Sequence, residues 1–189
     1  MTRCKGCSRC FHGFTGAGCL LVDITQNEII LIREVVSNKY NDMGGKIEQT
    51  KGSIPQNVSC ELYEETAMTV SIDSGIINKA KCVDISSGTS LNGYPHMYRS
   101  YILYVNKDRK DVSCTSYYKS LNRIMYDPTI GHQYKETSAM TRFSIDAIKR
   151  SAIINGRVLN LQRSINGDKV ALENRICKVL ALAIDEGKI

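Results

Sequence analysis

Residues 44–66 read GGKIEQTKGSIPQNVSCELYEET, and this stretch decides the fold of the chain. It predicts a helix over about residues 53–68. Ser53 and Gln56 have the spacing of a capping box, and Pro55 falls in the first turn, where its missing N–H is harmless. One face of this helix is apolar and is expected to pack on a sheet, because hydrophobic residues recur every four positions. These residues are Ile54, Val58 and Leu62.

Three carboxylates share another face of the same helix. At 100° per residue, Glu61, Glu64 and Glu65 fall within about a third of its circumference. They repel one another unless a cation lies among them, and hard oxygen ligands suit Mg²⁺ or Mn²⁺. An acidic face that only meets solvent is the alternative, and it is common for charge runs. Residues 40–48 predict a strand or a turn, and its two glycines, Gly44 and Gly45, offer a place where the backbone can approach the helix or a phosphate closely.

Short apolar runs on both sides of this stretch predict strands, and two further patterns predict helices. The expected strands cover residues 19–22, 28–32, 81–85, 97–105 and 139–143, and the expected helices cover 145–151 and about 172–183. Because strands and helices mix without a regular βαβ alternation, the fold class is expected to be α/β (α+β), with a mixed β-sheet between helices.

The order of two strands, a glycine pair and a glutamate-bearing helix resembles the Nudix hydrolase family. Gly45 matches the opening glycine of the family signature, and the core of the helix motif is matched by Glu61, Leu62, Glu64 and Glu65. The resemblance implies a Nudix-type α/β/α sandwich.

The same resemblance divides the chain into three parts. Residues 17–150 would form the Nudix domain, residues 1–16 a Cys-rich N-terminal segment, and residues 151–189 a C-terminal helical extension of the same domain.

The resemblance also implies a function: a metal-dependent hydrolase, or pyrophosphatase, that cleaves a diphosphate linkage in a nucleoside-diphosphate-linked substrate. It makes Glu61, Glu64 and Glu65 metal ligands and catalytic residues, and it places Gly44, Gly45 and Lys46 at the substrate. Glu136, just before the strand expected at 139–143, is the candidate for a further catalytic residue, and His132 is its alternative.

Several positions depart from the family signature. Cys60 stands where the family has arginine, and Ala67 where it has glycine. Counting forward from Gly45 puts Lys51 at the first acidic position of the family signature, and counting back from Glu61 puts Gly52 there. Neither residue is a carboxylate, and Glu48 is the nearest one. These departures keep a second hypothesis open: a catalytically impaired Nudix-fold module that binds nucleotide or RNA.

Composition limits the partners. The 189-residue chain has a formal net charge of +6, which favours polyanions such as RNA and nucleotides. Capped RNA (mRNA decapping) is the first expected substrate, because the chain resembles divergent Nudix proteins of eukaryotes and large DNA viruses. A free nucleotide or nucleoside diphosphate derivative is the second. Without tryptophan, tyrosines are the candidates for base stacking, although most tyrosines belong to cores. They are Tyr40, Tyr94, Tyr98, Tyr117 and Tyr118.

No apolar run is long enough to span a membrane, and the first residues lack the apolar core of a secretory signal. A cytoplasmic or nuclear location is expected, or the host cytoplasm if the protein is viral. The oligomeric state stays open.

The N-terminal segment carries a Cys-x2-Cys-x2-Cys-x-His pattern, formed by Cys4, Cys7, Cys10 and His12. Such ligands suit Zn²⁺, and a reduced, flexible tail is the alternative. A zinc-dependent interaction protein is accordingly a third functional hypothesis.

Overall fold

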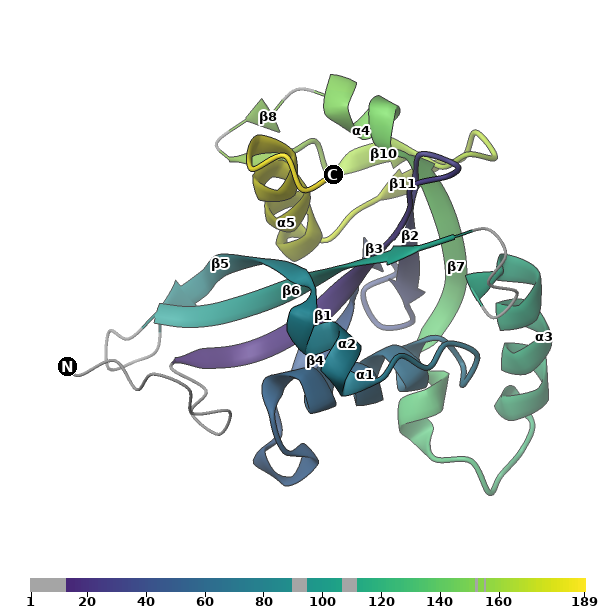
Figure 1. Ribbon diagram of the computed structural model, residues 1–189. Helices are drawn as coiled ribbons and strands as arrows, with labels where there is room; N and C mark the ends of the chain where they lie inside the picture. Colours follow the sequence, from purple (N-terminus) through teal and green to yellow (C-terminus); the bar gives the residue numbers. More distant parts are fainter. Residues whose placement is uncertain (1–12, 90–94, 107–111, 152, 155) are drawn as a thin grey trace.

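The computed structural model describes residues 13–89, 95–106, 112–151, 153–154 and 156–189 (Figure 1). Within these ranges, seven strands form one sheet, with the order β3-β2-β1-β6-β5, while β4 pairs with β1 and β7 with β2. The sheet is mixed, because β1 and β6 run parallel and β1 and β2 antiparallel. The strands are β1 (Phe14–Asp23), β2 (Glu28–Glu34), β3 (Tyr40–Asn41), β4 (Met43–Lys46), β5 (Lys81–Thr89), β6 (Pro95–Val105) and β7 (Thr137–Ser144).

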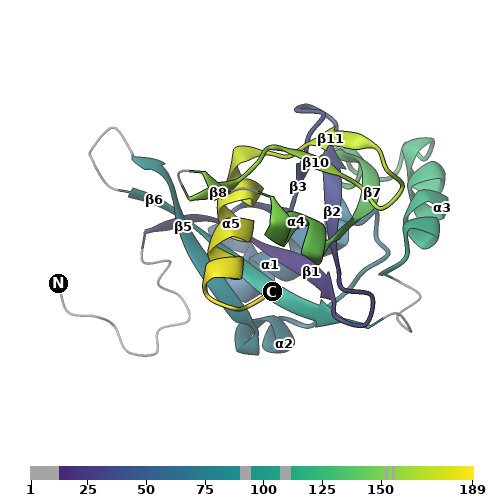
Figure 2. The same ribbon diagram turned by 90° about the horizontal axis from the view of Figure 1, so that it is seen from above.

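Helices cover both faces of the sheet (Figures 1 and 2). One face carries α1 (Ile54–Glu65), α2 (Ser74–Lys79) and α3 (Cys114–Met125), and the other carries α4 (Ile145–Arg150) and α5 (Asn174–Asp185). Each helical layer shares a separate hydrophobic cluster with the sheet. The expected α/β/α sandwich with a mixed sheet is therefore confirmed.

Short elements complete the described chain. Two 3₁₀ helices, η1 (Gln49–Lys51) and η3 (His132–Lys135), flank α1, and two small hairpins precede α5. The hairpins pair β8 (Ile153–Ile154) with β9 (Arg157–Val158), and β10 (Leu161–Arg163) with β11 (Lys169–Ala171).

Strand β1 is central to the packing because it is buried on both faces. Cys19 and Leu21 belong to the cluster under α1, while Leu20 and Val22 belong to the cluster under α5. Successive side chains of a strand point to opposite faces, so a strand between two helical layers reads as one continuous apolar run. Burial of each Leu contributes about 2 kcal/mol.

Helix α1 begins where the sequence predicts. The N–H of Ser53 donates to Gln56 Oε1 at 2.7 Å, as part of a capping box. The helix ends at Glu65 rather than near Met68, because Ala67 and Met68 have φ angles of 53° and 64°. Left-handed residues terminate a helix. The apolar face is buried as expected, through Ile54, Val58 and Leu62.

The segment that contains Tyr117 and Tyr118 forms α3, a helix that the sequence reasoning did not anticipate. Tyr40, Tyr98 and Tyr117 are at most 6% exposed. They are core residues and offer no face to a base. Tyr118 is 41% exposed, and Tyr94 lies outside the described residues.

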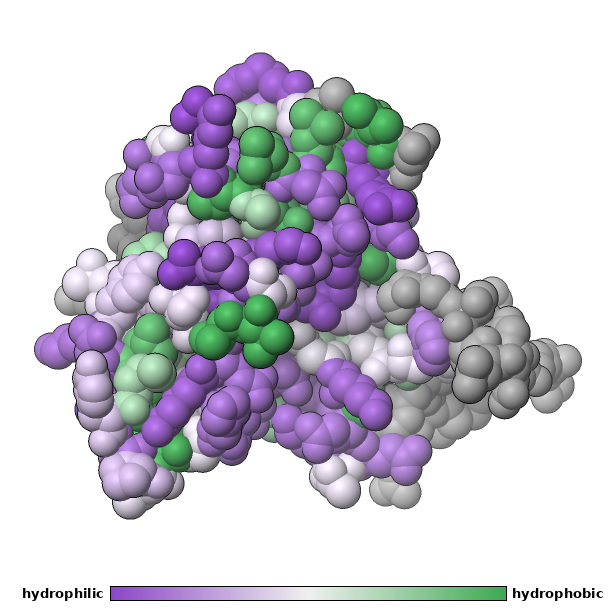
Figure 3. All heavy atoms as spheres, turned by 180° about the vertical axis from the view of Figure 1, so that it is seen from behind, coloured by the Kyte–Doolittle hydropathy of each residue, from purple (hydrophilic) through white to green (hydrophobic). Residues whose placement is uncertain are grey.

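The C-terminal segment contributes to the second cluster through α5, whose buried residues include Ile176 and Leu180. Its hairpins leave apolar side chains exposed, among them Ile154 and Leu161. Seen from behind, hydrophobic groups gather in this upper part of the molecule (Figure 3). Among the described residues, no helix has both the length and the apolar character that crossing a membrane requires.

Candidate active site

The glycine pair lies in a strand, which is one of the two alternatives, strand or turn, that the sequence left open. In β4, Gly44 pairs with Gly18 of β1, and Gly45 pairs with Ala17. The expected close approach to α1 is present: a Cβ atom on Gly45 would lie 2.6 Å from Glu61 Oε2. A side chain on Gly44 would overlap the Cα of Gly18. The absence of side chains here lets the helix carboxylates lie against the strand.

Glu65 is fixed from both of its ends. Its carboxylate accepts a hydrogen bond of 2.5 Å from the N–H of Gly44, and its carbonyl oxygen accepts one of 2.8 Å from Thr137 Oγ1. The residue is 8% exposed. Burial raises the pKa of Glu65 well above its ordinary value, and the charge of Glu61 adds to this effect. A cation nearby would favour the ionised form.

A cation of the chain itself lies among the other carboxylates. The Nζ atom of Lys51 is 3.2 Å from Oε1 of Glu48, 3.2 Å from Oε1 of Glu61 and 3.2 Å from Oε2 of Glu64. Burial by itself would lower the pKa of Lys51, but these carboxylates outweigh it and raise the pKa above its usual range. The carboxylate cluster therefore consists of Glu48, Glu61 and Glu64, and it holds the one positive charge of Lys51.

The donor set has the chemistry of a divalent-cation site. It consists of carboxylate oxygens, the ligands that Mg²⁺ and Mn²⁺ prefer. Its spacing fits an ammonium: the oxygens lie 3.2 Å from Lys51 Nζ, whereas Mg²⁺ requires about 2.1 Å. As the side chains stand, no three His, Cys, Asp or Glu residues in the described ranges are arranged to hold a metal ion. The carboxylates would have to close in around a smaller ion.

The loop that carries Lys51 is anchored by a buried amide. Asn57 Oδ1 accepts a hydrogen bond of 2.7 Å from the N–H of Glu48, and its Nδ2 donates to the carbonyl oxygen of Ser53 at 3.0 Å. Asn57 is 1% exposed. Sequence reasoning missed this residue, although a polar side chain beside Val58 on the apolar face was a signal.

A second cation approaches from the opposite helical layer. The guanidinium of Arg175 in α5 lies 4.5 Å from the ring centroid of Tyr98. Its Nη2 donates to the carbonyl oxygen of Gly44 at 3.1 Å, and its Nε donates to Asp42 Oδ1 at 3.2 Å. Asp42 is fully buried and also accepts from Tyr98 and Ser100. Sequence reasoning missed this arrangement, because Arg175 lies 131 positions from Gly44 and no local pattern links the two residues.

An open pocket with a volume of 420 Å³ lies beside the cluster. Its walls include Lys51 and Cys60, together with the polar residues Ser59, Asp73 and Ser74. Cys60 thus borders the pocket. Unlike the arginine of the family signature, its thiol carries no charge that could orient a neighbouring carboxylate.

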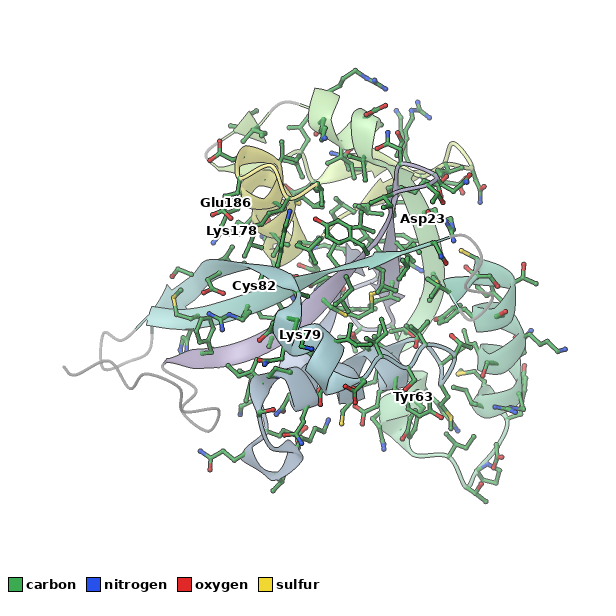
Figure 4. All side chains as sticks on the ribbon, viewed as in Figure 1. Asp23, Tyr63, Lys79, Cys82, Lys178 and Glu186 are labelled. Atoms are coloured by element: carbon green, nitrogen blue, oxygen red, sulfur yellow. The ribbon has the colours of Figure 1, made fainter. Side chains whose placement is uncertain are left out.

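Glu136 lies at the end of η3, directly before the strand β7. Its Oε1 is 3.9 Å from His132 Nδ1, and the side chains of Glu136 and His132 are 56% and 90% exposed. η3 contacts α1. The ring centroid of Tyr134 in η3 lies 6.2 Å from that of Tyr63 in α1, which is labelled in Figure 4. Lys46 is exposed at the end of β4. The roles of Glu136, His132 and Lys46 stay predictions.

The cysteines divide into two groups. Cys4, Cys7 and Cys10, with His12, lie outside the described residues, so the zinc hypothesis stays a prediction. Among the described cysteines, Cys19 and Cys177 are buried free thiols.

Comparison with known proteins gives no close relative. No family model matches the sequence, and no curated protein matches it. Solved structures do match. The C. elegans Ap4A hydrolase binary complex is 12% identical over 92% of this chain and 98% of its own, with a TM-score of 0.46. A NUDIX hydrolase from Nitrosomonas europaea is 18% identical over 71% of this chain and 74% of its own, with a TM-score of 0.40.

A third structure is a bifunctional NMN adenylyltransferase/ADP ribose pyrophosphatase from Francisella tularensis, complexed with AMP and a manganese ion. It is 16% identical over 49% of this chain, with a TM-score of 0.38, and this chain spans 27% of its length. The mixed sheet and the two helical layers of this chain agree with the α/β/α sandwich expected from the sequence.

Proposed function

We propose that this chain is a Nudix-type pyrophosphohydrolase, which cleaves a diphosphate linkage in a nucleoside-diphosphate-linked substrate with the help of Mg²⁺ or Mn²⁺. One observation carries the proposal. Carboxylates from a single helix, α1, lie against the glycine strand β4 and already gather around a positive charge. Such a cluster is unfavourable without a cation, and a divalent metal ion would supply more positive charge than Lys51 does.

In this proposal Glu61, Glu64 and Glu65 hold the metal. When bound, the metal would neutralise charge on the diphosphate and activate a water molecule. Gly44 fixes the carboxylate of Glu65 through its N–H. Gly45 keeps the space above Glu61 free of a side chain.

Residues around this centre would take part in binding and proton transfer. Lys46, exposed at the end of β4, would contact the negatively charged substrate. Glu136 would accept a proton from the attacking water, with His132 as its alternative.

Capped RNA is the first substrate that we propose, and a free nucleotide or a nucleoside diphosphate derivative is the second. The net charge of +6 supports a substrate with many phosphates. An RNA body adds phosphate contacts, so its binding would weaken strongly as salt increases, whereas binding of a small nucleotide would weaken less.

A second function is favoured by two of the residues described above. Lys51 already neutralises part of the carboxylate cluster, and Cys60 supplies no charge beside it. A Nudix-fold module that binds nucleotide or RNA without cleaving it would have these features.

The two functions separate in one assay. Purified protein with Mg²⁺ or Mn²⁺ is incubated with capped RNA, ADP-ribose, nucleoside triphosphates and diphosphoinositol phosphates. Glu61→Gln and Glu65→Gln are tested alongside, and Glu186→Gln at the end of α5 is the matched control. We expect metal-dependent cleavage of one class that both site variants lose and the control keeps. Tight binding without cleavage would support the binding module instead.

A further inference from the structure

Lys51 is held more firmly than a surface lysine. Its ammonium contacts three carboxylates at 3.2 Å, and its side chain is 22% exposed. The side chains of its partners Glu61 and Glu64 are 14% and 16% exposed. In this half-buried setting the charges are screened less than on an open surface.

We propose that Lys51 competes with a divalent cation for the oxygens of Glu48, Glu61 and Glu64, and thereby determines which cation the cluster holds. The inference rests on the proposed function, because two of these carboxylates, Glu61 and Glu64, are among those to which that function assigns the metal. It adds that the chain carries its own competitor for that metal.

The spacing of the cluster supports this competition. Oxygens placed 3.2 Å from Lys51 Nζ must move inward by about 1 Å to reach the distance that Mg²⁺ requires. The ammonium occupies the centre into which they would move. Two cations at that centre would repel each other, so the lysine has to leave when a metal binds.

The surroundings give the displaced lysine a place to go. Lys51 is the last residue of η1 and also lines the pocket of 420 Å³ beside α1. The residues that line this pocket also include Asp73, which has a carboxylate, and Ser74, which has a hydroxyl. A flexible four-carbon stem lets an ammonium move between two such positions while the backbone stays in place.

Manganese binding tests the proposal without any substrate. The affinity for Mn²⁺ is measured by electron paramagnetic resonance of the free ion, for the wild type and three variants. Lys51→Met removes the charge and keeps the length of the side chain, while Lys51→Arg keeps the charge. Lys79→Met removes the same charge from an exposed position at the end of α2.

We expect Lys51→Met to bind Mn²⁺ about tenfold more tightly than the wild type. Lys51→Arg and Lys79→Met should bind no more tightly than the wild type. In the Lys51→Met background, Glu61→Gln should abolish the gain, which locates the ion. Melting temperatures of all variants with and without Mn²⁺ show that each is folded.

An unchanged or weaker Mn²⁺ affinity in folded Lys51→Met would overturn the competition. An equal gain in Lys79→Met would overturn it too, because net charge would then explain the effect. The outcomes separate this inference from the hydrolase itself. If Lys51→Met binds Mn²⁺ more tightly and the protein cleaves no substrate, the competition is supported and the hydrolase is opposed. If the protein cleaves a substrate and Lys51→Met binds Mn²⁺ as the wild type does, the hydrolase is supported and the competition is opposed.

Discussion

Arg175 donates a hydrogen bond of 3.1 Å to the carbonyl oxygen of Gly44, although the two residues belong to α5 and β4 and are 131 positions apart. The N–H of the same glycine donates to the carboxylate of Glu65. A cation on one face of the sheet therefore fixes the strand residue that holds a carboxylate of the helix on the other face. Cys60, next to Glu61 in α1, has no charge and so cannot position a carboxylate from within the helix.

Replacing Arg175 by methionine should lower the free energy of unfolding by about 3 kcal/mol, because it leaves Asp42 buried without its cationic partner. Arg175→Lys keeps the charge and should lose less. Urea denaturation followed by circular dichroism at pH 7 measures both. The control is Arg163→Met, a substitution at an exposed residue, which should change the value by less than about 0.5 kcal/mol. Equal midpoints for Arg175→Met and Arg163→Met would contradict this role.

The pKa of Glu65 predicts how stability depends on pH. Burial raises this pKa in the folded protein, so folding favours the protonated carboxyl. The sign follows: stability is present below the unfolded pKa of about 4.3 and falls as pH rises through the folded pKa. Without metal, Glu65→Gln should match the wild type near pH 4 and melt at a higher temperature at pH 8. Calorimetry in EDTA measures the difference.

Adding Mn²⁺ supplies the control for this pH series. If the metal binds Glu65, it should raise the melting temperature of the wild type at pH 8 more than that of Glu65→Gln. A wild type that melts above Glu65→Gln at pH 8 in EDTA would mean that the hydrogen bond from Gly44 outweighs the effect of burial.

Local patterns in the sequence were sufficient for the central elements. The capping box and the apolar period of α1 depend on neighbouring residues, and so does the face shared by Glu61, Glu64 and Glu65. The short apolar run at residues 19–22 likewise predicted a strand, which is part of β1. Helix α3 was missed, although Tyr117, Leu121 and Ile124 have the spacing of the buried face of an amphipathic helix.

The charge partners could not be predicted in the same way. Lys51 lies 10 and 13 positions from Glu61 and Glu64, and Arg175 lies 133 positions from Asp42. These pairs exist only once the chain is folded, so no local period or spacing marks them. The sequence left a strand or a turn open at the glycine pair for a related reason: the pairing of Gly44 with Gly18, which makes this segment a strand, is a tertiary contact.

Ala67 gives a test of how α1 ends. Its φ of 53° is a left-handed conformation that favours glycine, and the residue is fully buried. Ala67→Gly relieves about 1 kcal/mol of backbone strain and loses about 0.8 kcal/mol of methyl burial, so stability should hardly change. Ala67→Val adds a β-branched side chain in the same conformation and should destabilise by more than about 2 kcal/mol. Urea denaturation compares the two, and equal losses would contradict the importance of φ.

Glu136→Gln tests the proton acceptor that we propose. If the carboxylate takes a proton from the attacking water, kcat should fall by about 10²-fold or more, while KM changes little. The affinity for Mn²⁺ should stay at the wild-type value, because Glu136 lies in η3–β7 and not among the carboxylates around Lys51. A role as metal ligand would weaken Mn²⁺ binding as well. His132→Gln is the matched variant: its side chain is 90% exposed and 3.9 Å from Glu136. Loss of kcat in His132→Gln with full activity in Glu136→Gln would assign the proton transfer to the histidine.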